Sequence, residues 1–549
     1  SDNISQISNI DDGKENYSYN NQINKSENIK EDINSNSSIS STDNFNKNHI
    51  SKNIATTNNV SKNNDNTIKS NNLNNNGSFY VSIDGNDNND GSESSPFRTI
   101  ANAINHANAI SSESTIIIKK GTYKEHELHA VNNLIIIGEN ITIDGENNYI
   151  IKSDKNLVVN GISFINSNSS NSGAIYSDEA NITVINSKFI NCSSDEYYGG
   201  AIYTERGNVN IINSTFNNIK SKYSGGGAIY SYYGNVNIIN STFNNIKSKY
   251  SGGGAIYSYY GNVNIINSTF NNIKSVEGYG GVVYTDYGNT SIINSKFNNI
   301  SADEGGILYT DEGNLIIRNS EFNNIKSKYS GGAFYGYNGN ISSVNSNFTN
   351  ITSKSNGGVF YTSEGIVHLV NSTFINNSAF RGGVVYTDYE NSDVFAINST
   401  FVNNHGDYAG GVMNSENTIH VLNCSFINNS APRGGALIAT NDNNTVINSK
   451  FINNHANNYG GALSFNNVIV SNSSFINNTA SNGSAIFTNF ANVTNSKFTN
   501  NSGKDGYSIV FLTNGTVTNS TIDKNQIKTF NYKFRNITYR SYTDDGYFT

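Results

Sequence analysis

Val209 to Ile219 reads Val-Asn-Ile-Ile-Asn-Ser-Thr-Phe-Asn-Asn-Ile, and this stretch decides the fold because its core recurs along the chain. The pattern Asn-Ser-x-Phe-x-Asn, once with Cys424 in place of Ser, occurs thirteen times at intervals of 23 to 27 residues. A fixed short period means that each repeat is one supersecondary unit, which buries its apolar face by stacking on its neighbours. The thirteen phenylalanines are Phe189, Phe216, Phe243, Phe270, Phe297, Phe322, Phe348, Phe374, Phe401, Phe426, Phe451, Phe475 and Phe498.

Each repeat combines the Val209–Ile219 motif with a second one, Gly-Gly-Ala-Ile-Tyr, as at Gly226 to Tyr230. Both motifs are short, β-prone runs bounded by Gly and Asn, so they predict strands joined by turns. The repeats lack an apolar 3.6-residue period, and the interval is too short for a four-stranded propeller blade. The sequence therefore predicts an all-β solenoid with one coil per repeat.

Substitutions between repeats indicate which way side chains point. The position two before Phe holds only Ser or Cys, which predicts a cramped inward site, whereas the position directly before Phe varies freely and is expected to face solvent. Phe then points inward and stacks on the next Phe about 4.8 Å along the axis, which gives a column of roughly 58 Å over its twelve steps. The invariant Asn three before and two after Phe (Asn213 and Asn218 in one repeat) are predicted to form left-handed turns and amide ladders.

A tyrosine follows the Gly-Gly motif at one position in eight successive repeats. The residue before it is always apolar and suits an inward site, so alternation along a strand predicts that the tyrosines point outward. Such an exposed stripe could bind sugar rings or a partner protein, or it could be a cross-coil ladder favoured by β-propensity. The eight candidate ligand-binding residues are Tyr203, Tyr230, Tyr257, Tyr284, Tyr309, Tyr335, Tyr361 and Tyr386.

Three regions divide the chain. Residues 1–76 are rich in Asn, Ser, Lys and Asp with few aromatics, which predicts a disordered spacer. Residues 77–515 are expected to form the solenoid, with an N-terminal cap at 77–112 and repeats at about 160–505. Within the cap, Ser95 and Pro96 are predicted to open an amphipathic helix as N-cap and first residue. Residues 516–549 lose the motif and are predicted to be a C-terminal cap or the start of a continuation.

The opening Asp84 to Gly91 and Ser95 to Ile100 resembles that of many right-handed parallel β-helix proteins with a pectate-lyase-like fold. The paired signals Gly-Gly-Ala-Ile and Phe-x-x-Asn resemble the repeats of polymorphic outer membrane proteins and of Asn-rich adhesin-like proteins of methanogenic archaea. The resemblance covers roughly residues 77–515. It implies a right-handed parallel β-helix and a secreted, cell-surface role in attachment to glycans or envelope components.

Polysaccharide lyases and hydrolases on this fold need clustered carboxylates, and the turn after the tyrosine offers one adjacent acidic pair, Asp286 and Asp311. Two carboxylates about 5 Å apart could share a proton or hold Ca²⁺. The oxygen-rich loop from Asp84 to Asp90 is a second, weaker candidate for a structural Ca²⁺. No other cofactor is expected.

The function that the sequence favours is a non-enzymatic adhesin-like or envelope protein, with a carbohydrate-active enzyme as the alternative, because the repeats are chemically monotonous. A net charge of −8 without charge blocks predicts no nucleic-acid binding. No apolar run is long enough to predict a membrane span. Frequent Asn-x-Ser/Thr sequons fit a secreted glycoprotein.

Overall fold

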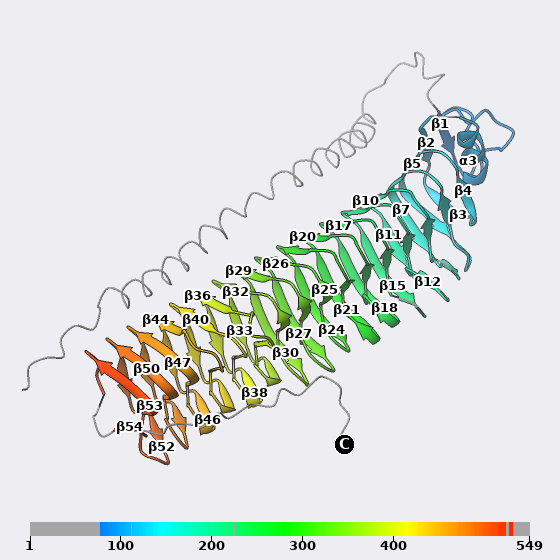
Figure 1. Ribbon diagram of the computed structural model, residues 1–549. Helices are drawn as coiled ribbons and strands as arrows, with labels where there is room; N and C mark the ends of the chain where they lie inside the picture. Colours follow the sequence, from blue (N-terminus) through cyan, green and yellow to red (C-terminus); the bar gives the residue numbers. More distant parts are fainter. Residues whose placement is uncertain are drawn as a thin grey trace, which may run out of the picture. The chain divides into compact units, whose positions relative to one another are not determined.

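The computed structural model describes residues 77–110, 112–170, 172–196, 198–223, 225–522 and 526–530. All strand pairings between coils are parallel, and the coils follow one another along a common axis (Figure 1). The chain in this region is a parallel β-helix, as predicted. The proposed spacer at 1–76 and residues 531–549 of the proposed C-terminal region lie outside the described residues.

Three runs of strands form the sides of the repeating coils, and we name them by their most frequent residue. The tyrosine strands follow the Gly-Gly turn; they are β9 (Ile175–Ser177), β13 (Ile202–Thr204), β16 (Ile229–Ser231), β19 (Ile256–Ser258), β22 (Val283–Thr285), β25 (Leu308–Glu312), β28 (Phe334–Asn338), β31 (Phe360–Glu364), β35 (Val385–Thr387), β39 (Met413–Ser415) and β43 (Leu437–Ala439). The valine strands come next in each coil; they are β10 (Ile182–Ile185), β14 (Val209–Ile212), β17 (Val236–Ile239), β20 (Val263–Ile266), β23 (Thr290–Ile293), β26 (Leu315–Arg318), β29 (Ile341–Val344), β32 (Val367–Val370), β36 (Val394–Ile397), β40 (Ile419–Leu422) and β44 (Asn444–Ile447).

The phenylalanine strands form the third side. They are β11 (Lys188–Ile190), β15 (Thr215–Ser221), β18 (Thr242–Gly252), β21 (Thr269–Tyr279), β24 (Lys296–Ala302), β27 (Glu321–Ser327), β30 (Asn347–Ser353), β33 (Thr373–Ile375), β37 (Thr400–Val402), β41 (Ser425–Ile427), β45 (Lys450–Ile452), β48 (Ser474–Ile476) and β51 (Lys497–Thr499). Short closing strands lead toward the next Gly-Gly turn where the phenylalanine strand ends early: β8 (Asn168–Ser169), β12 (Ser193–Ser194), β34 (Ser378–Arg381), β38 (His405–Ala409), β42 (Ser430–Arg433), β46 (His455–Tyr459), β49 (Thr479–Ala480) and β52 (Ser502–Gly503).

The two ends of the β-helix are less regular. The first coils contain β1 (Ser78–Val81), β2 (Ser114–Ile118), β3 (Gly121–Lys124), β4 (Leu128–Ala130), β5 (Leu134–Asp144), β6 (Ile151–Ser153) and β7 (Leu157–Ile165). In the last coils the tyrosine and valine strands merge into β47 (Leu463–Ser471), β50 (Ile486–Thr494) and β53 (Ile509–Thr518), and β54 (Ile527–Thr529) pairs with β53. Parallel pairing therefore continues beyond residue 515.

The phenylalanine column lies inside the β-helix, as predicted. From Phe189 to Phe498 each ring stacks on the next, with centroids 4.5–5.1 Å apart, and every ring is buried. The Ser and Cys424 site beside it is also buried, and both Cys192 and Cys424 are free thiols. Burying one aromatic ring contributes roughly 1.5–3 kcal/mol, so the column is a main stabilising element.

Both invariant Asn columns form turns, as predicted. All of these asparagines have φ between 49° and 57°, in the left-handed region that Asn tolerates better than most residues. Their amides also bond across coils; for example, Asn213 Nδ2 donates to Asn186 Oδ1 (3.3 Å) and Asn218 Nδ2 to Asn191 Oδ1 (3.3 Å).

The helix in the N-terminal region, α3 (Ile100–Asn108), begins later than predicted. Its N-cap is Thr99, whose side chain accepts from the Asn102 amide, so the predicted start at Ser95 and Pro96 is wrong. The reason is that Phe97 is buried and bonds to β1 through its amide, which donates to the Tyr80 carbonyl (2.9 Å). The helix packs against β1, β2 and β4, and its role as a cap stays a prediction.

Candidate functional site

The tyrosine strands align their tyrosines in register across successive coils. Tyr230 pairs with Tyr257 and Tyr257 with Tyr284, with ring centroids 4.5 Å and 4.9 Å apart. The stack continues through Tyr309 to Tyr386 with spacings of 4.6–5.7 Å. The eight tyrosines therefore form one continuous column along the β-helix.

The prediction that this column is exposed is wrong. Tyr203, Tyr230, Tyr257, Tyr361 and Tyr386 are buried, and the other three members, Tyr284, Tyr309 and Tyr335, are partly buried.

The rings do point away from the main core, since Tyr203, Tyr230 and Tyr257 form a second, separate apolar cluster. What buries them is the segment that enters the Gly-Gly turn of the preceding coil and folds over them. A Cβ on Gly225 would lie 2.5 Å from a Tyr257 ring carbon, and one on Gly252 would lie 2.6 Å from Tyr284. Only glycine allows this close cover, so the glycines and the tyrosines form one packed layer rather than an open platform.

The exposed aromatic array lies at the following turn, between the tyrosine and valine strands. Tyr233, Tyr260 and Tyr287 are 51%, 45% and 48% exposed, and their rings stack at 5.1 Å per coil. Tyr232 and Tyr259 form a parallel inner row, 4.9 Å apart, set at 78° to the outer rings beside them. We call these five residues the turn-tyrosine ladder. The signal in the sequence was the tyrosine directly before Gly234, Gly261 and Gly288, which recurs every 27 residues.

The acidic pair lies beside the ladder. The Tyr284 hydroxyl donates to Asp286 Oδ1 (2.8 Å), and the Tyr309 hydroxyl donates to Asp311 Oδ1 (3.0 Å). Burial raises the pKa of Asp311 above its usual value; the Tyr309 hydrogen bond opposes this shift, and the neighbouring Asp286 carboxylate adds to it. Whether the two carboxylates share a proton or hold Ca²⁺ stays a prediction.

Asp286 also connects the pair to the ladder. A hydrogen bond to its carboxylate raises the pKa of Tyr259, an inner member of the ladder. The arrangement places exposed ring faces, phenol hydroxyls and a carboxylate side by side. This combination can stack on the apolar face of a sugar ring and bond its hydroxyl groups.

Among the residues that the structure describes, no group of three His, Cys, Asp or Glu side chains is arranged to hold a metal ion, whereas Ca²⁺ takes six to eight oxygens. In the Asp84–Asp90 loop, Asp90 accepts from the Ser92 amide (3.0 Å), which lowers the pKa of Asp90. The carboxylate of Asp87 is occupied by the Arg98 and Thr99 amides in front of α3.

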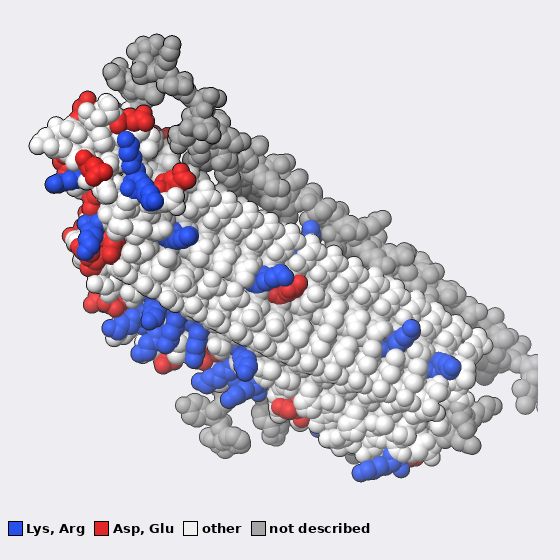
Figure 2. Space-filling view, turned by 180° about the vertical axis from the view of Figure 1, so that it is seen from behind, with Lys and Arg blue, Asp and Glu red and all other residues white. Residues whose placement is uncertain are grey.

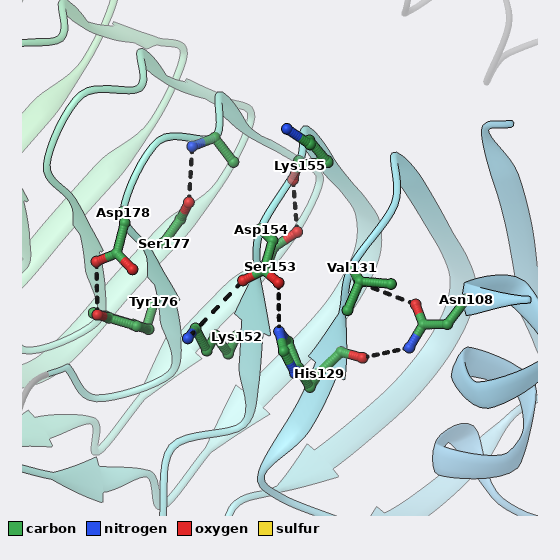
Figure 3. A network of polar contacts seen from close by, with 11 residues as sticks. Asn108, His129, Val131, Lys152, Ser153, Asp154, Lys155, Tyr176, Ser177 and Asp178 are labelled. Atoms are coloured by element: carbon green, nitrogen blue, oxygen red, sulfur yellow. Dashed lines mark hydrogen bonds and ion pairs between the residues drawn. The ribbon is translucent and has the colours of Figure 1, made fainter. Parts of the chain in front are cut away.

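The tyrosine column also extends toward the N-terminus beyond the predicted members. His129, Lys152 and Tyr176 occupy successive coils of the same column, next to Tyr203. Figure 3 shows this region: Asp154 lies between His129 (2.8 Å) and Lys152 (3.9 Å), and Tyr176 donates to Asp178 (2.7 Å). The aspartate two residues after the tyrosine thus accepts a hydrogen bond from the tyrosine hydroxyl in this coil. The same bond is made by the tyrosines of β22 and β25. Sequence analysis missed these positions because the Gly-Gly motif weakens in the first coils.

Stacked coils of this kind define a parallel β-helix repeat protein. Residues 213–232 and 240–259 match the model of the Chlamydia polymorphic membrane protein repeat, and the two matched segments end at Tyr232 and Tyr259 of the turn-tyrosine ladder. No curated protein matches the chain.

Solved structures with some likeness to this chain include the A-module of a mannuronan C-5 epimerase from Azotobacter vinelandii, at 10% identity and a TM-score of 0.24, covering 78% of this chain and 94% of that one. A PL6 family alginate lyase (9% identity, TM-score 0.22) covers 82% of this chain and 88% of its own. A rhamnogalacturonan lyase (11% identity, TM-score 0.18) covers 68% and 82%. Within the described residues, no helix has the length and apolar composition needed to cross a membrane.

Proposed function

We propose that this protein is a non-enzymatic surface protein of the adhesin-like or envelope type, which binds glycans or partner surfaces along the side of its β-helix. The observation that carries the proposal is the turn-tyrosine ladder, whose outer rings stay about half exposed while stacked at 5.1 Å. Soluble proteins seldom leave a contiguous row of aromatic side chains in water unless it contacts something. The repeat match supports a place at the outer cell surface.

The ladder suits a polymer better than a small ligand. Each ring offers one weak stacking contact, but rings at coil spacing present the same contact repeatedly to an extended chain. Linked weak contacts gain strength through effective concentration. We therefore expect affinity to rise with the length of the glycan.

The enzymatic alternative would rest on Asp286 and Asp311, which are the clustered carboxylates beside the ladder. In glycosidases the two carboxyl groups stand about 5–9.5 Å apart so that a sugar bond or a water fits between them. Burial, together with the charge of Asp286, raises the pKa of Asp311, and each of the two carboxylates accepts a tyrosine hydroxyl. This geometry favours a structural acidic pair.

A glycan array followed by titration tests the proposal. We expect Tyr233→Ser, Tyr260→Ser and Tyr287→Ser together to weaken binding to the best glycan roughly tenfold or more, through loss of stacking. The matched control changes three exposed tyrosines at a different corner, Tyr329, Tyr408 and Tyr459, to Ser and should bind as the parent does. Equal binding by both triple variants would contradict the proposal. Release of new sugar ends that disappears in Asp286→Asn or Asp311→Asn would favour the enzyme.

A further inference from the structure

Basic side chains gather along one edge of the β-helix, beside a broad face that carries few charges (Figure 2). Residues 207–276 contain five lysines and neither Asp nor Glu, although the whole chain has a net charge of −8. These lysines are Lys220, Lys222, Lys247, Lys249 and Lys274. They are widely separated in the sequence, which is why sequence analysis found no basic cluster.

Stacking of the coils brings three of these lysines into one row. Lys220 pairs in register with Lys247, and Lys247 with Lys274, so their backbones are about 4.8 Å apart. All three side chains are exposed, because they alternate with inward residues such as Ile219 and Ser221. Like charges directly opposite each other on neighbouring strands destabilise a sheet, so stability does not account for this row.

A tyrosine lies three residues after each of the first two lysines of the row, Tyr223 after Lys220 and Tyr250 after Lys247. Lys222 Nζ lies 5.3 Å from the Tyr223 ring, and Lys249 Nζ lies 4.6 Å from the Tyr250 ring. The two rings are 6.1 Å apart, and Tyr223 is 53% exposed. These two coils therefore each present a pair of lysines together with one aromatic face, whereas the third coil has Val276 and Glu277 at the corresponding positions.

None of the five lysines forms an ion pair with any residue in the part of the chain that the structure describes. The nearest acidic residues in sequence are Glu205 on one side and Glu277 on the other. Glu277 pairs in register with Tyr250, next to Lys249 and outside the row of Lys220, Lys247 and Lys274.

We propose that this lysine row binds a linear polyanion, namely an extended acidic polysaccharide with one carboxylate on each sugar. Such a chain repeats its charge about once per sugar length, which is close to the coil spacing, and its ring faces can pack on Tyr223 and Tyr250. Double-stranded DNA carries one charge per about 1.7 Å of axis, far denser than one lysine per coil. The site lies at a different corner from the turn-tyrosine ladder, so either proposal can fail while the other stands.

Titration of the full chain with polygalacturonate at low salt tests the proposal. We expect Lys220→Ser, Lys247→Ser and Lys274→Ser together to weaken binding roughly tenfold or more, and to reduce the slope of log K against log salt by about 2. Serine is the natural residue at the next position of this column, Ser301, so the fold should tolerate it. Circular dichroism of the variant checks this.

The matched control removes the same charge elsewhere, by Lys188→Thr, Lys450→Ser and Lys497→Ser at exposed sites before the phenylalanines. This control should bind polygalacturonate within about twofold of the parent. Equal loss in both triple variants, or no loss in the first, would overturn the proposal. So would tighter binding of oligothymidylate, or of vesicles of phosphatidylserine and phosphatidylcholine, than of polygalacturonate.

Discussion

At the scale of single residues, two tyrosines three positions apart have different roles. Tyr257 is buried beneath the backbone at Gly225 of the preceding coil and stacks on both neighbouring tyrosines, whereas Tyr260 is 45% exposed at the turn. We expect Tyr257→Ala to lower the free energy of unfolding by about 3–5 kcal/mol, as for other buried aromatics, and Tyr260→Ala by about 1 kcal/mol or less. Urea unfolding followed by circular dichroism measures both values, and equal losses would contradict the assignment.

Asp311 makes stability depend on pH. Burial and the Asp286 carboxylate raise the pKa of Asp311 in the folded protein above its unfolded value of about 3.9. The contribution of Asp311 to stability is therefore fully present below about pH 3.9, and it is lost as the pH rises through the folded pKa. We expect Asp311→Asn, which can still accept from Tyr309, to be more stable than the parent at pH 7.5 and less dependent on pH between 4 and 7.5. Urea midpoints across that range measure this, and a variant that is less stable at pH 7.5 would contradict it.

At the scale of strands and turns, the features that repeat in every coil could be predicted from the sequence. The contacts that form only when coils stack on one another could not. The phenylalanine column and the Asn turns were predictable because identical residues at one position in thirteen coils must share one environment. The direction of the tyrosines was also right, but alternation along a strand cannot show that a segment of another coil covers Tyr257. The predicted start of α3 was wrong because β1 holds Phe97, and because Asp87 accepts from the Thr99 amide while Glu125 accepts from the first two amides of the helix.

A ladder of buried asparagines in the later coils was likewise not predicted. Asn377, Asn404, Asn429, Asn454 and Asn478 are fully buried where earlier coils have Ile, as at Ile219. The Asn429 amide group donates to Asn454 Oδ1 (3.0 Å) and to the Phe401 carbonyl (3.0 Å), while its Oδ1 accepts from Asn404. The donors and acceptors of each buried asparagine are thereby paired with those of its neighbours, which explains how these polar side chains are accommodated in the core.

Because the buried asparagines bond one another, replacing one of them should lower the stability of the neighbouring coils as well. We expect Asn429→Ala to lower the free energy of unfolding by about 1–3 kcal/mol or more, because buried groups on both neighbouring coils lose their partners. Asn458→Ala, at an exposed position on β46 in the next coil, should change it by less than about 0.5 kcal/mol. Urea unfolding compares the two variants, and an Asn429→Ala variant as stable as the parent would show that the ladder bonds are not formed.

At the scale of the whole molecule, both proposed binding surfaces exist only because coils stack in register. Residues 27 apart become neighbours, so three separate lysines form a row and three separate tyrosines form an exposed ladder. Neither surface could be predicted from local sequence, because each coil contributes only one or two side chains. Stability in such an array is nearly a sum over coils and their interfaces.

The most direct test of this account is the distance between spin labels at Lys188→Cys and Lys497→Cys, measured by pulsed electron paramagnetic resonance. The buried native thiols are first replaced by the residues of the same positions in other coils, Cys192→Ile and Cys424→Ser. The two labels stand at equivalent exposed positions before Phe189 and Phe498, twelve coil steps apart. Stacking in register predicts one narrow distribution centred near about 58 Å. A broad distribution, or a mean below about 40 Å, would contradict the stacked β-helix and both surfaces that depend on it.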